Sequence, residues 1–202
     1  MKTFYQVISL VFQPLLMPTY AFLMLMNMDM YRTLPLLWRW IAIGGTFLFT
    51  GVFPAVTIFL MIRKGEVHDL FISKREERTM PYLFSFMAYV FWVLFLYRTL
   101  QFLPNYVVVM GVGSVASIFV IVFINLKWKI SAHLSGIGGL TGAIFGICYK
   151  MALNPVWLFT LILFISALVA LSRIELKAHT PSQTLAGFVI GFLMIFLPCV
   201  FY

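Results

Sequence analysis

The chain is divided into seven long apolar segments by short polar gaps, and this pattern limits its possible folds more than any other feature. A helix needs about 20 apolar residues to cross the roughly 30 Å hydrocarbon layer of a bilayer, whereas a barrel strand needs about 10. These segments are too long for barrel strands. In lipid, backbone N–H and C=O groups find hydrogen-bond partners only within helices or closed barrels, so the segments are expected to be helices. The segments comprise residues 4–28, 36–62, 81–100, 105–126, 130–149, 155–171 and 182–202.

The sequence therefore predicts an all-α fold, a polytopic membrane helical bundle with six or seven transmembrane helices, forming a single integral-membrane domain over residues 1–202. The number stays open because of the first segment. Pro14 and Pro18 remove backbone donors from it and kink a helix, so this segment either is broken or lies in the membrane interface.

The charges fit a membrane protein and exclude a nucleic-acid partner. Only 10% of the residues are charged, and the net charge of +8 comes from basic residues that lie in the polar gaps, where they set orientation. Cys148 and Cys199 lie in apolar segments without metal-ligand spacing, so we expect no metal and no cofactor. We expect a multi-pass protein of a bacterial inner (cell) membrane, with no protein partner indicated.

Three polar gaps are expected to meet at one face of the membrane. They comprise residues 64–81, 127–133 and 172–187, and two apolar segments separate each gap from the next. An even number of crossings returns the chain to the same face. The candidate residues of these gaps are Lys74, Arg75, Arg78, His133, Arg173 and His179.

Each of these gaps also leads into a helix. Ser73 followed by Glu76 fits a capping box, Ser131 is placed to cap the next helix, and Thr180 and Gln183 frame a proline at the first helical position. Helix starts present free N–H groups and a positive dipole end, which favour an anion. Three helix starts are thus predicted to face one anion.

Glycines spaced four residues apart mark two of the later segments. They are Gly138, Gly142 and Gly146 in one segment and Gly187 and Gly191 in the last. Small residues along one stripe allow membrane helices to approach closely. We interpret these glycines as packing positions.

The last gap contains the most specific motif. Ser172 and Arg173 are followed after five residues by His179, and after three more by Gln183. This pattern resembles the third signature of the type 2 phosphatidic acid phosphatase (PAP2) superfamily, in which aspartate takes the place of Gln183. The Ser-Ala-His of residues 131–133 resembles the second signature, and residues 74–81 resemble the first.

The resemblance implies a metal-independent phosphatase in which one histidine attacks phosphorus. By position, His179 is the nucleophile, and His133 is the acid that protonates the departing alkoxide. Gln183 is expected to orient His179 through its carbonyl oxygen. The residues expected to hold the phosphate oxygens are Arg173, Ser131 and the basic group of Lys74, Arg75 and Arg78. The chemistry agrees, because phosphoryl transfer needs a neutral nucleophile, a group that titrates near neutral pH and fixed positive donors.

The predicted function is hydrolysis of a lipid phosphate or diphosphate through a phosphohistidine at the membrane interface. The alternative is a catalytically degenerate member that binds anionic lipid headgroups without turnover, an interpretation that Gln183 favours. A transporter is disfavoured because no apolar segment carries an acidic residue at its centre. On a seven-span topology, ten Lys and Arg residues lie on the face of the predicted site and four on the other. Four of the ten are candidate phosphate ligands, and Lys2 changes sides if the first segment does not cross, so the orientation stays open.

Overall fold

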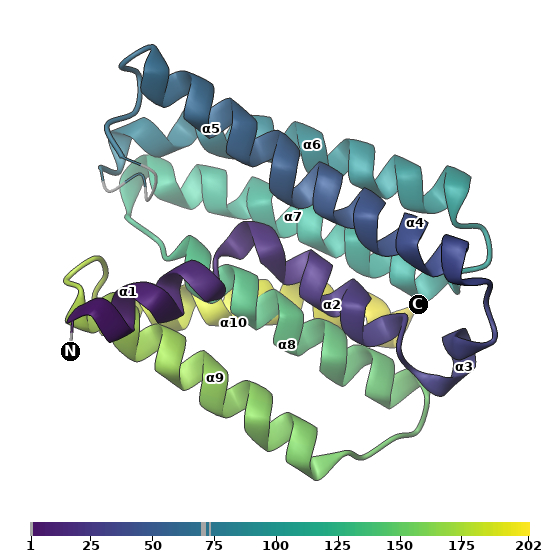
Figure 1. The fold of residues 1–202 in the computed structure, drawn as a ribbon. Coiled ribbons are helices and arrows are strands. Elements are labelled where there is room, and N and C mark those ends of the chain that lie inside the picture. Colours follow the sequence, from purple (N-terminus) through teal and green to yellow (C-terminus); the bar gives the residue numbers. More distant parts are fainter. Residues whose placement is uncertain (1, 70–71, 73) are drawn as a thin grey trace.

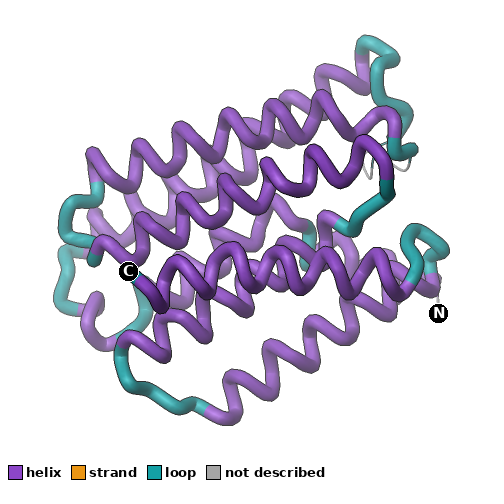
Figure 2. Tube along the Cα trace, turned by 180° about the vertical axis from the view of Figure 1, so that it is seen from behind, coloured by secondary structure: helices purple, strands orange, loops and turns teal. Residues whose placement is uncertain are grey.

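The structure of the protein is a computed structural model that describes residues 2–69, 72 and 74–202. These residues form a bundle of long helices whose connections lie at its two ends (Figures 1 and 2). Within them, seven helices are long and apolar enough to cross a membrane, which confirms the predicted all-α membrane bundle. The N- and C-terminal ends lie at opposite ends of the bundle (Figure 1).

The helical elements follow the predicted segments with small shifts at their ends. The elements are α1 (Lys2–Val11), η1 (Pro14–Leu16), α2 (Met17–Leu25), α3 (Asp29–Arg32), α4 (Leu36–Thr46), η2 (Phe47–Val52), α5 (Phe53–Arg63), η3 (Glu76–Arg78), α6 (Thr79–Thr99), α7 (Asn105–Lys127), α8 (Ala132–Lys150), α9 (Val156–Glu175) and α10 (Pro181–Phe201).

The first span is broken but still runs from one end of the bundle to the other (Figure 1). Helix α1 ends at Val11, a short 3-10 turn begins at Pro14, and α2 continues to Leu25. Proline has no N–H to donate and its ring clashes with the preceding turn, which accounts for the break. Of the two numbers of spans left open by the sequence, the structure has seven helices of sufficient length, the broken one included.

Helix α8 lies at the centre of the bundle, and α10 packs directly against its backbone. Of the apolar stretch of α8, 78% is buried, against 22–39% in the other spans. A Cβ added to Gly191 would lie 2.0 Å from the carbonyl oxygen of Ser135, and one added to Gly138 would lie 2.3 Å from that of Phe188. Real Cβ atoms do not approach so closely, so the predicted packing role of these glycines is confirmed.

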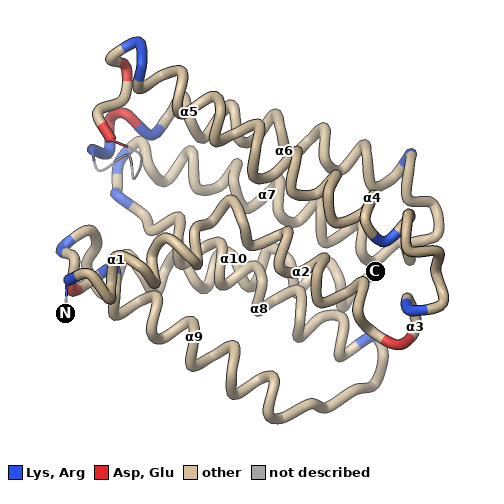
Figure 3. The backbone as a smooth tube through the Cα atoms, viewed as in Figure 1, with Lys and Arg blue, Asp and Glu red and all other residues tan. Residues whose placement is uncertain are grey.

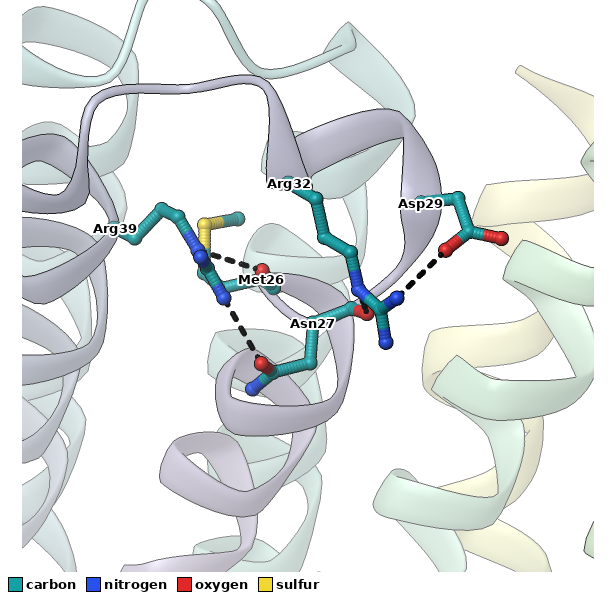
Figure 4. Close-up of polar contacts among 5 residues, drawn as sticks. All are labelled: Met26, Asn27, Asp29, Arg32 and Arg39. Carbon is teal, nitrogen blue, oxygen red and sulfur yellow. Dashed lines mark hydrogen bonds and ion pairs between the residues drawn. The ribbon is translucent and has the colours of Figure 1, made fainter.

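The end of the bundle that holds the C-terminus is closed by a turn between α2 and α4. Arg39 donates from Nε to the carbonyl oxygen of Met26 (2.9 Å) and from Nη2 to Asn27 Oδ1 (2.9 Å) (Figure 4). Arg32 donates to the carbonyl oxygen of Asn27 (3.1 Å) and pairs with Asp29 (3.2 Å). These contacts satisfy carbonyls that the end of α2 leaves without helical partners.

Two of the predicted helix caps are present. Ser131 Oγ accepts from the backbone N–H of Leu134 (3.4 Å) and caps α8. Thr180 and Gln183 form the predicted capping box of α10, with Pro181 at the first helical position. The third proposed cap, Ser73, lies outside the described residues.

Charged residues gather at the two ends of the bundle (Figure 3). One end carries the N-terminus, the connection from α5 to α6, the connection from α7 to α8 and the connection from α9 to α10 (Figure 1). These connections contain the three polar gaps, so the parity prediction that they share one face is confirmed.

Candidate active site

The turn that follows α9 sets the spacing between Arg173 and His179. The backbone N–H of Ala178 donates to the carbonyl oxygen of Arg173 (3.0 Å), and that of Lys177 donates to Ile174 (2.8 Å). Lys177 has a φ of 52°, the left-handed conformation that ends a helix in this pattern. The backbone N–H of His179 also donates to the Arg173 carbonyl (3.2 Å). The chain therefore folds back, and His179 returns to the level of Arg173.

The capping box of α10 then orients the His179 ring. Gln183 Oε1 accepts from the backbone N–H of Thr180 (3.2 Å) and lies 3.1 Å from His179 Nδ1. A carbonyl oxygen only accepts, so Nδ1 carries the proton and Nε2 keeps its lone pair. Gln183 thus completes the cap and holds the imidazole with the same oxygen atom.

His133, in the first turn of α8, is held by the main chain of the first span. Its Nε2 lies 3.1 Å from the carbonyl oxygen of Ser9, and both residues are buried. Ser9 lies in the last turn of α1, where carbonyl oxygens lack partners within the helix. Since this oxygen accepts, Nε2 of His133 is the donor. In the neutral ring, Nδ1 is then the nitrogen that keeps its lone pair.

Arg78 is fixed at the same end of the bundle by two carbonyl oxygens. Its Nε donates to Ile72 (2.8 Å) and its Nη1 to Ile130 (3.2 Å). Only 3% of Arg78 and 4% of Arg173 is exposed. Both guanidinium groups are therefore buried, and both line the same cavity, where two positive charges favour a bound anion.

Arg78, His133, Arg173 and His179 line one cavity of about 190 Å³. The chain brings them there from three connections that lie far apart in the sequence. Among the described residues that line this cavity, none is acidic. The arrangement therefore offers two imidazoles and two fixed cations to a bound anion.

The other predicted phosphate ligands lie elsewhere, and none of them is among the described residues that line the cavity. Lys74 pairs with Glu77 (3.3 Å), which also binds His68 (2.7 Å). Arg75 donates to the carbonyl oxygens of Asn125 (3.2 Å) and Leu126 and so caps the end of α7. The Ser131 hydroxyl caps α8, as described above. Of the three basic candidates in the first gap, the structure thus brings Arg78 to the two histidines.

Burial and charge keep the His179 imidazole neutral. Desolvation, followed by the positive charges of Arg78 and Arg173, lowers the pKa of His179 from 6.5 to about 3. The Gln183 bond works in the opposite direction but is weaker. A neutral ring with a free Nε2 lone pair is the form in which histidine acts as a nucleophile.

Lys129 is a further cation near the site that the sequence pattern did not reveal. Burial, followed by the charges of Arg78 and Arg173, lowers its pKa. In the sequence, Lys129 lies two residues from Lys127 in the same polar gap, and no feature distinguishes the two lysines. Tyr82 also lines the cavity, and its hydroxyl interacts with Arg78. Tyr82 directly follows the proline of the first signature, and this adjacency is the signal that identifies it.

Metal ligands are not grouped in the part of the chain that the structure describes. Over residues 2–69, 72 and 74–202, no three His, Cys, Asp or Glu side chains are placed to hold one metal ion. Cys148 and Cys199 are both free and buried.

Comparison with known proteins identifies a family for this chain. The family model of the PAP2 superfamily, a family of phosphatase type, matches residues 82–202. No curated protein and no solved structure matches the chain. The matched region covers more than half of the chain and includes His133, Arg173 and His179. The chain belongs to the PAP2 superfamily.

Proposed function

We propose that this protein is a metal-independent phosphatase that acts on a lipid phosphate or diphosphate through a phosphohistidine. One observation carries the proposal: two imidazoles line a single cavity with two buried arginines, and each ring has one nitrogen held by a carbonyl oxygen. Held rings keep a defined tautomer and direction, which a phosphoryl transfer between them requires. The proposed setting is the cell membrane of a bacterium.

In the first step, His179 Nε2 attacks phosphorus while the bond from phosphorus to the lipid oxygen breaks. His133 keeps its Nε2–H on the Ser9 carbonyl, takes the remaining proton of the bound phosphate monoanion on Nδ1, and passes this Nδ1–H to the leaving oxygen. Arg78 and Arg173 stabilise the charge that accumulates on the equatorial phosphate oxygens. The products are the lipid alcohol and a phosphorylated His179.

In the second step, water replaces His179 on phosphorus. His133, now neutral, removes a proton from water through Nδ1 as the new oxygen–phosphorus bond forms. The bond from phosphorus to Nε2 breaks, and its electron pair returns to the His179 ring. Inorganic phosphate leaves, and both histidines recover the states in which they began.

The test is phosphate release by the purified protein from lipid phosphates and diphosphates in the presence of a chelator. We expect His179→Ala to lower the rate by at least 10³-fold, because the covalent step is lost. His68→Ala is the matched control, since His68 pairs with Glu77 at the surface and does not line the cavity. Undiminished release by His179→Ala would refute His179 as the nucleophile.

A second candidate, a headgroup-binding protein without turnover, is favoured by Gln183. An amide oxygen fixes the tautomer of His179 but supplies no negative charge to stabilise a developing imidazolium. In serine proteases, loss of the corresponding carboxylate costs about 10⁴ in rate. Gln183→Glu restores the charge at the same side-chain length, and Gln183→Leu removes the acceptor.

For an active phosphatase we expect Gln183→Leu to lower kcat by about 10–100-fold, the usual range for loss of an outer residue that orients a functional histidine. If the wild-type protein binds a lipid phosphate without releasing phosphate from it, and the Gln183→Glu variant does release phosphate, the protein is the degenerate binder. Phosphate release and lipid binding are measured on the same preparations to separate the two functions.

A further inference from the structure

Asn125 is a polar side chain that is buried near the end of α7 and has no part in the proposed mechanism. Only 2% of it is exposed, and among the Asn and Gln residues that the structure describes it is the only one that is buried. It is not among the described residues that line the cavity. Burial of an amide is costly unless the amide forms hydrogen bonds, so its contacts indicate what it contributes.

Asn125 and Arg75, which lie 50 residues apart in the sequence, bond to each other. Asn125 Nδ2 donates to the carbonyl oxygen of Arg75 (3.1 Å). In return, Arg75 Nη1 donates to the carbonyl oxygens of Asn125 (3.2 Å) and Leu126. The side-chain oxygen of Asn125 is buried and has no hydrogen-bond partner among the described residues. Its N–H group is therefore the part of the side chain that joins the α5–α6 connection to the end of α7.

The carbonyl oxygen that Asn125 holds also accepts the hydrogen bond that closes the turn before α6. The backbone N–H of Arg78 donates to the carbonyl oxygen of Arg75 (3.2 Å), at the start of the 3-10 turn η3. A carbonyl oxygen has two lone pairs and accepts both bonds. Asn125 therefore fixes the backbone from which the Arg78 side chain extends.

The Arg78 side chain is held by the same part of the fold. Its Nη1 donates to the carbonyl oxygen of Ile130 (3.2 Å), which lies in the connection that follows α7. The N–H groups that its bonds to Ile72 and Ile130 leave over are available to the cavity that Arg78 lines. In enzymes, a displacement of about 1 Å in a group that holds the substrate can cost about 10²-fold in rate. The docking of the Arg78 turn on α7 is therefore expected to affect the chemistry.

We propose that Asn125 is a positioning residue for the phosphate site, because it fixes the Arg75 carbonyl oxygen and with it the turn that carries Arg78. The inference rests on the proposed function, which assigns the phosphate oxygens to Arg78 and Arg173. Asn125 does not line the cavity, so its effect on a bound phosphate passes through Arg78. The effect of removing Asn125 must then disappear when residue 78 is no longer an arginine.

The first experiment observes the Arg78 turn without any ligand. Asn125→Leu removes the N–H donor at a similar side-chain volume, and Asn105→Leu is the matched control, since Asn105 is exposed in the first turn of the same helix. Amide hydrogen exchange is measured on the purified full-length proteins in detergent. We expect the backbone N–H of Arg78 to exchange about 3–10-fold faster in Asn125→Leu, as for the loss of one hydrogen bond, and at the wild-type rate in Asn105→Leu. Unaltered exchange in Asn125→Leu would overturn the proposal, whatever the activity of the protein.

The second experiment measures kcat/KM for a lipid phosphate in wild type, Asn125→Leu, Arg78→Lys and the double variant. We expect Asn125→Leu to lower kcat/KM about 10–100-fold when Arg78 is present, as for other residues that orient a ligand-binding group. In the Arg78→Lys background the same substitution should change it less than about twofold, because the flexible lysine does not use the fixed geometry of the guanidinium. Equal factors in the two backgrounds would show that Asn125 only stabilises the fold.

A binding measurement keeps this proposal separable from the proposed function. If the wild-type protein releases no phosphate, the affinity for inorganic phosphate replaces kcat/KM in the same four proteins. Binding without turnover, with the effect of Asn125→Leu confined to the Arg78 background, rejects the phosphatase and retains the positioning role. Turnover with equal factors in both backgrounds does the reverse, and a wild type that neither turns over a lipid phosphate nor binds inorganic phosphate overturns both.

A second variant covers the case in which Asn125→Leu does not fold. Arg75→Leu removes the bonds to the α7 carbonyl oxygens from the other side of the contact, at a side chain that is 33% exposed. The same loss is expected when Arg78 is present, and none beyond about twofold in the Arg78→Lys background. An Arg75→Leu protein with wild-type kcat/KM would overturn the proposal.

Discussion

Each buried imidazole has one ring nitrogen bonded to a carbonyl oxygen, and the proposed mechanism uses the other nitrogen. For His179 the acceptor is the Gln183 side chain, and for His133 it is the main chain at Ser9. These contacts settle which nitrogen carries a proton in each neutral ring. The free nitrogens are Nε2 of His179 and Nδ1 of His133, so opposite ring atoms of the two residues are available.

The first prediction concerns the titration of His179. Its pKa of about 3 means that the ring stays neutral, with the proton on Nδ1, from pH 8 down to pH 5 in phosphate-free solution. A bound anion offsets the charges of Arg78 and Arg173 and favours the imidazolium, so saturating phosphate should raise this pKa. Nitrogen NMR of the imidazoles reports both states, and the chain has only three histidines to assign.

His179→Gln identifies the signal that belongs to this residue. The His68 ring, 63% exposed at the surface, is the internal reference. A His179 ring that is half protonated near pH 6.5 without phosphate would show that the burial and charge of the cavity do not act on it.

Residue identity within the site was only partly predictable. The spacing of Arg173, His179 and Gln183 is local, because one turn and one capping box determine it, and the sequence contains both. The choice among Lys74, Arg75 and Arg78 is not local. It depends on the 3-10 turn at 76–78 and on carbonyl oxygens of α7 and of the α7–α8 connection, which no pattern in the first gap specifies.

At the scale of elements, the contact between α8 and α10 determines how far apart the two histidines stand. His133 opens α8, and His179 directly precedes α10. Gly187 and Gly191 let the α10 backbone reach the carbonyl oxygens of Ser131 and Ser135. The separation of the imidazoles is therefore set by glycines that carry no chemistry.

The second prediction follows from this contact. Gly191→Ala places a Cβ 2.0 Å from the Ser135 carbonyl oxygen, so the helices must separate. We expect a loss of about 1–3 kcal/mol in the free energy of unfolding, as for other overpacked cores. Thermal unfolding in detergent measures the loss, and phosphate release should decline with it.

Gly44→Ala is the control, since a Cβ there meets nothing within 4 Å. It should unfold at or above the wild-type temperature, because alanine favours helix over glycine. If Gly191→Ala unfolds at the same temperature as Gly44→Ala, the close approach of α8 and α10 is not a source of stability.

The elements themselves were predictable because hydropathy and helix caps are properties of short stretches. The segments, the caps at Ser131 and Thr180 and the break at Pro14 all follow from the sequence. The end of α9 differs, because the apolar run stops at residue 171 while the helix continues to Glu175. Arg173 thus lies inside a helical turn and is buried by neighbours that its own segment does not reveal.

At the scale of the whole molecule, an odd number of spans places the first and the last described residues on opposite sides of the membrane. The third prediction tests this topology with single cysteines and an impermeant thiol reagent. Cysteines at Lys64 and Lys177 should react from one side, and cysteines at Arg32 and Gln101 from the other, because the connections alternate between the ends (Figure 1).

The native Cys148 and Cys199 are buried and should remain unlabelled. The same labelling in intact cells identifies the face to which the cavity opens. Reaction of Lys177→Cys and Arg32→Cys from the same side would contradict a bundle of seven crossings.

The two residues that hold the imidazoles come from opposite ends of the chain, Ser9 from the first helix and Gln183 from the last. A ribosome delivers Ser9 early in synthesis and Gln183 only after the other six spans have been made. Until α10 is integrated, a nascent chain has one imidazole without its acceptor. On the proposed function, chains whose translation stops before α10 are therefore expected to be inert toward the lipids around them.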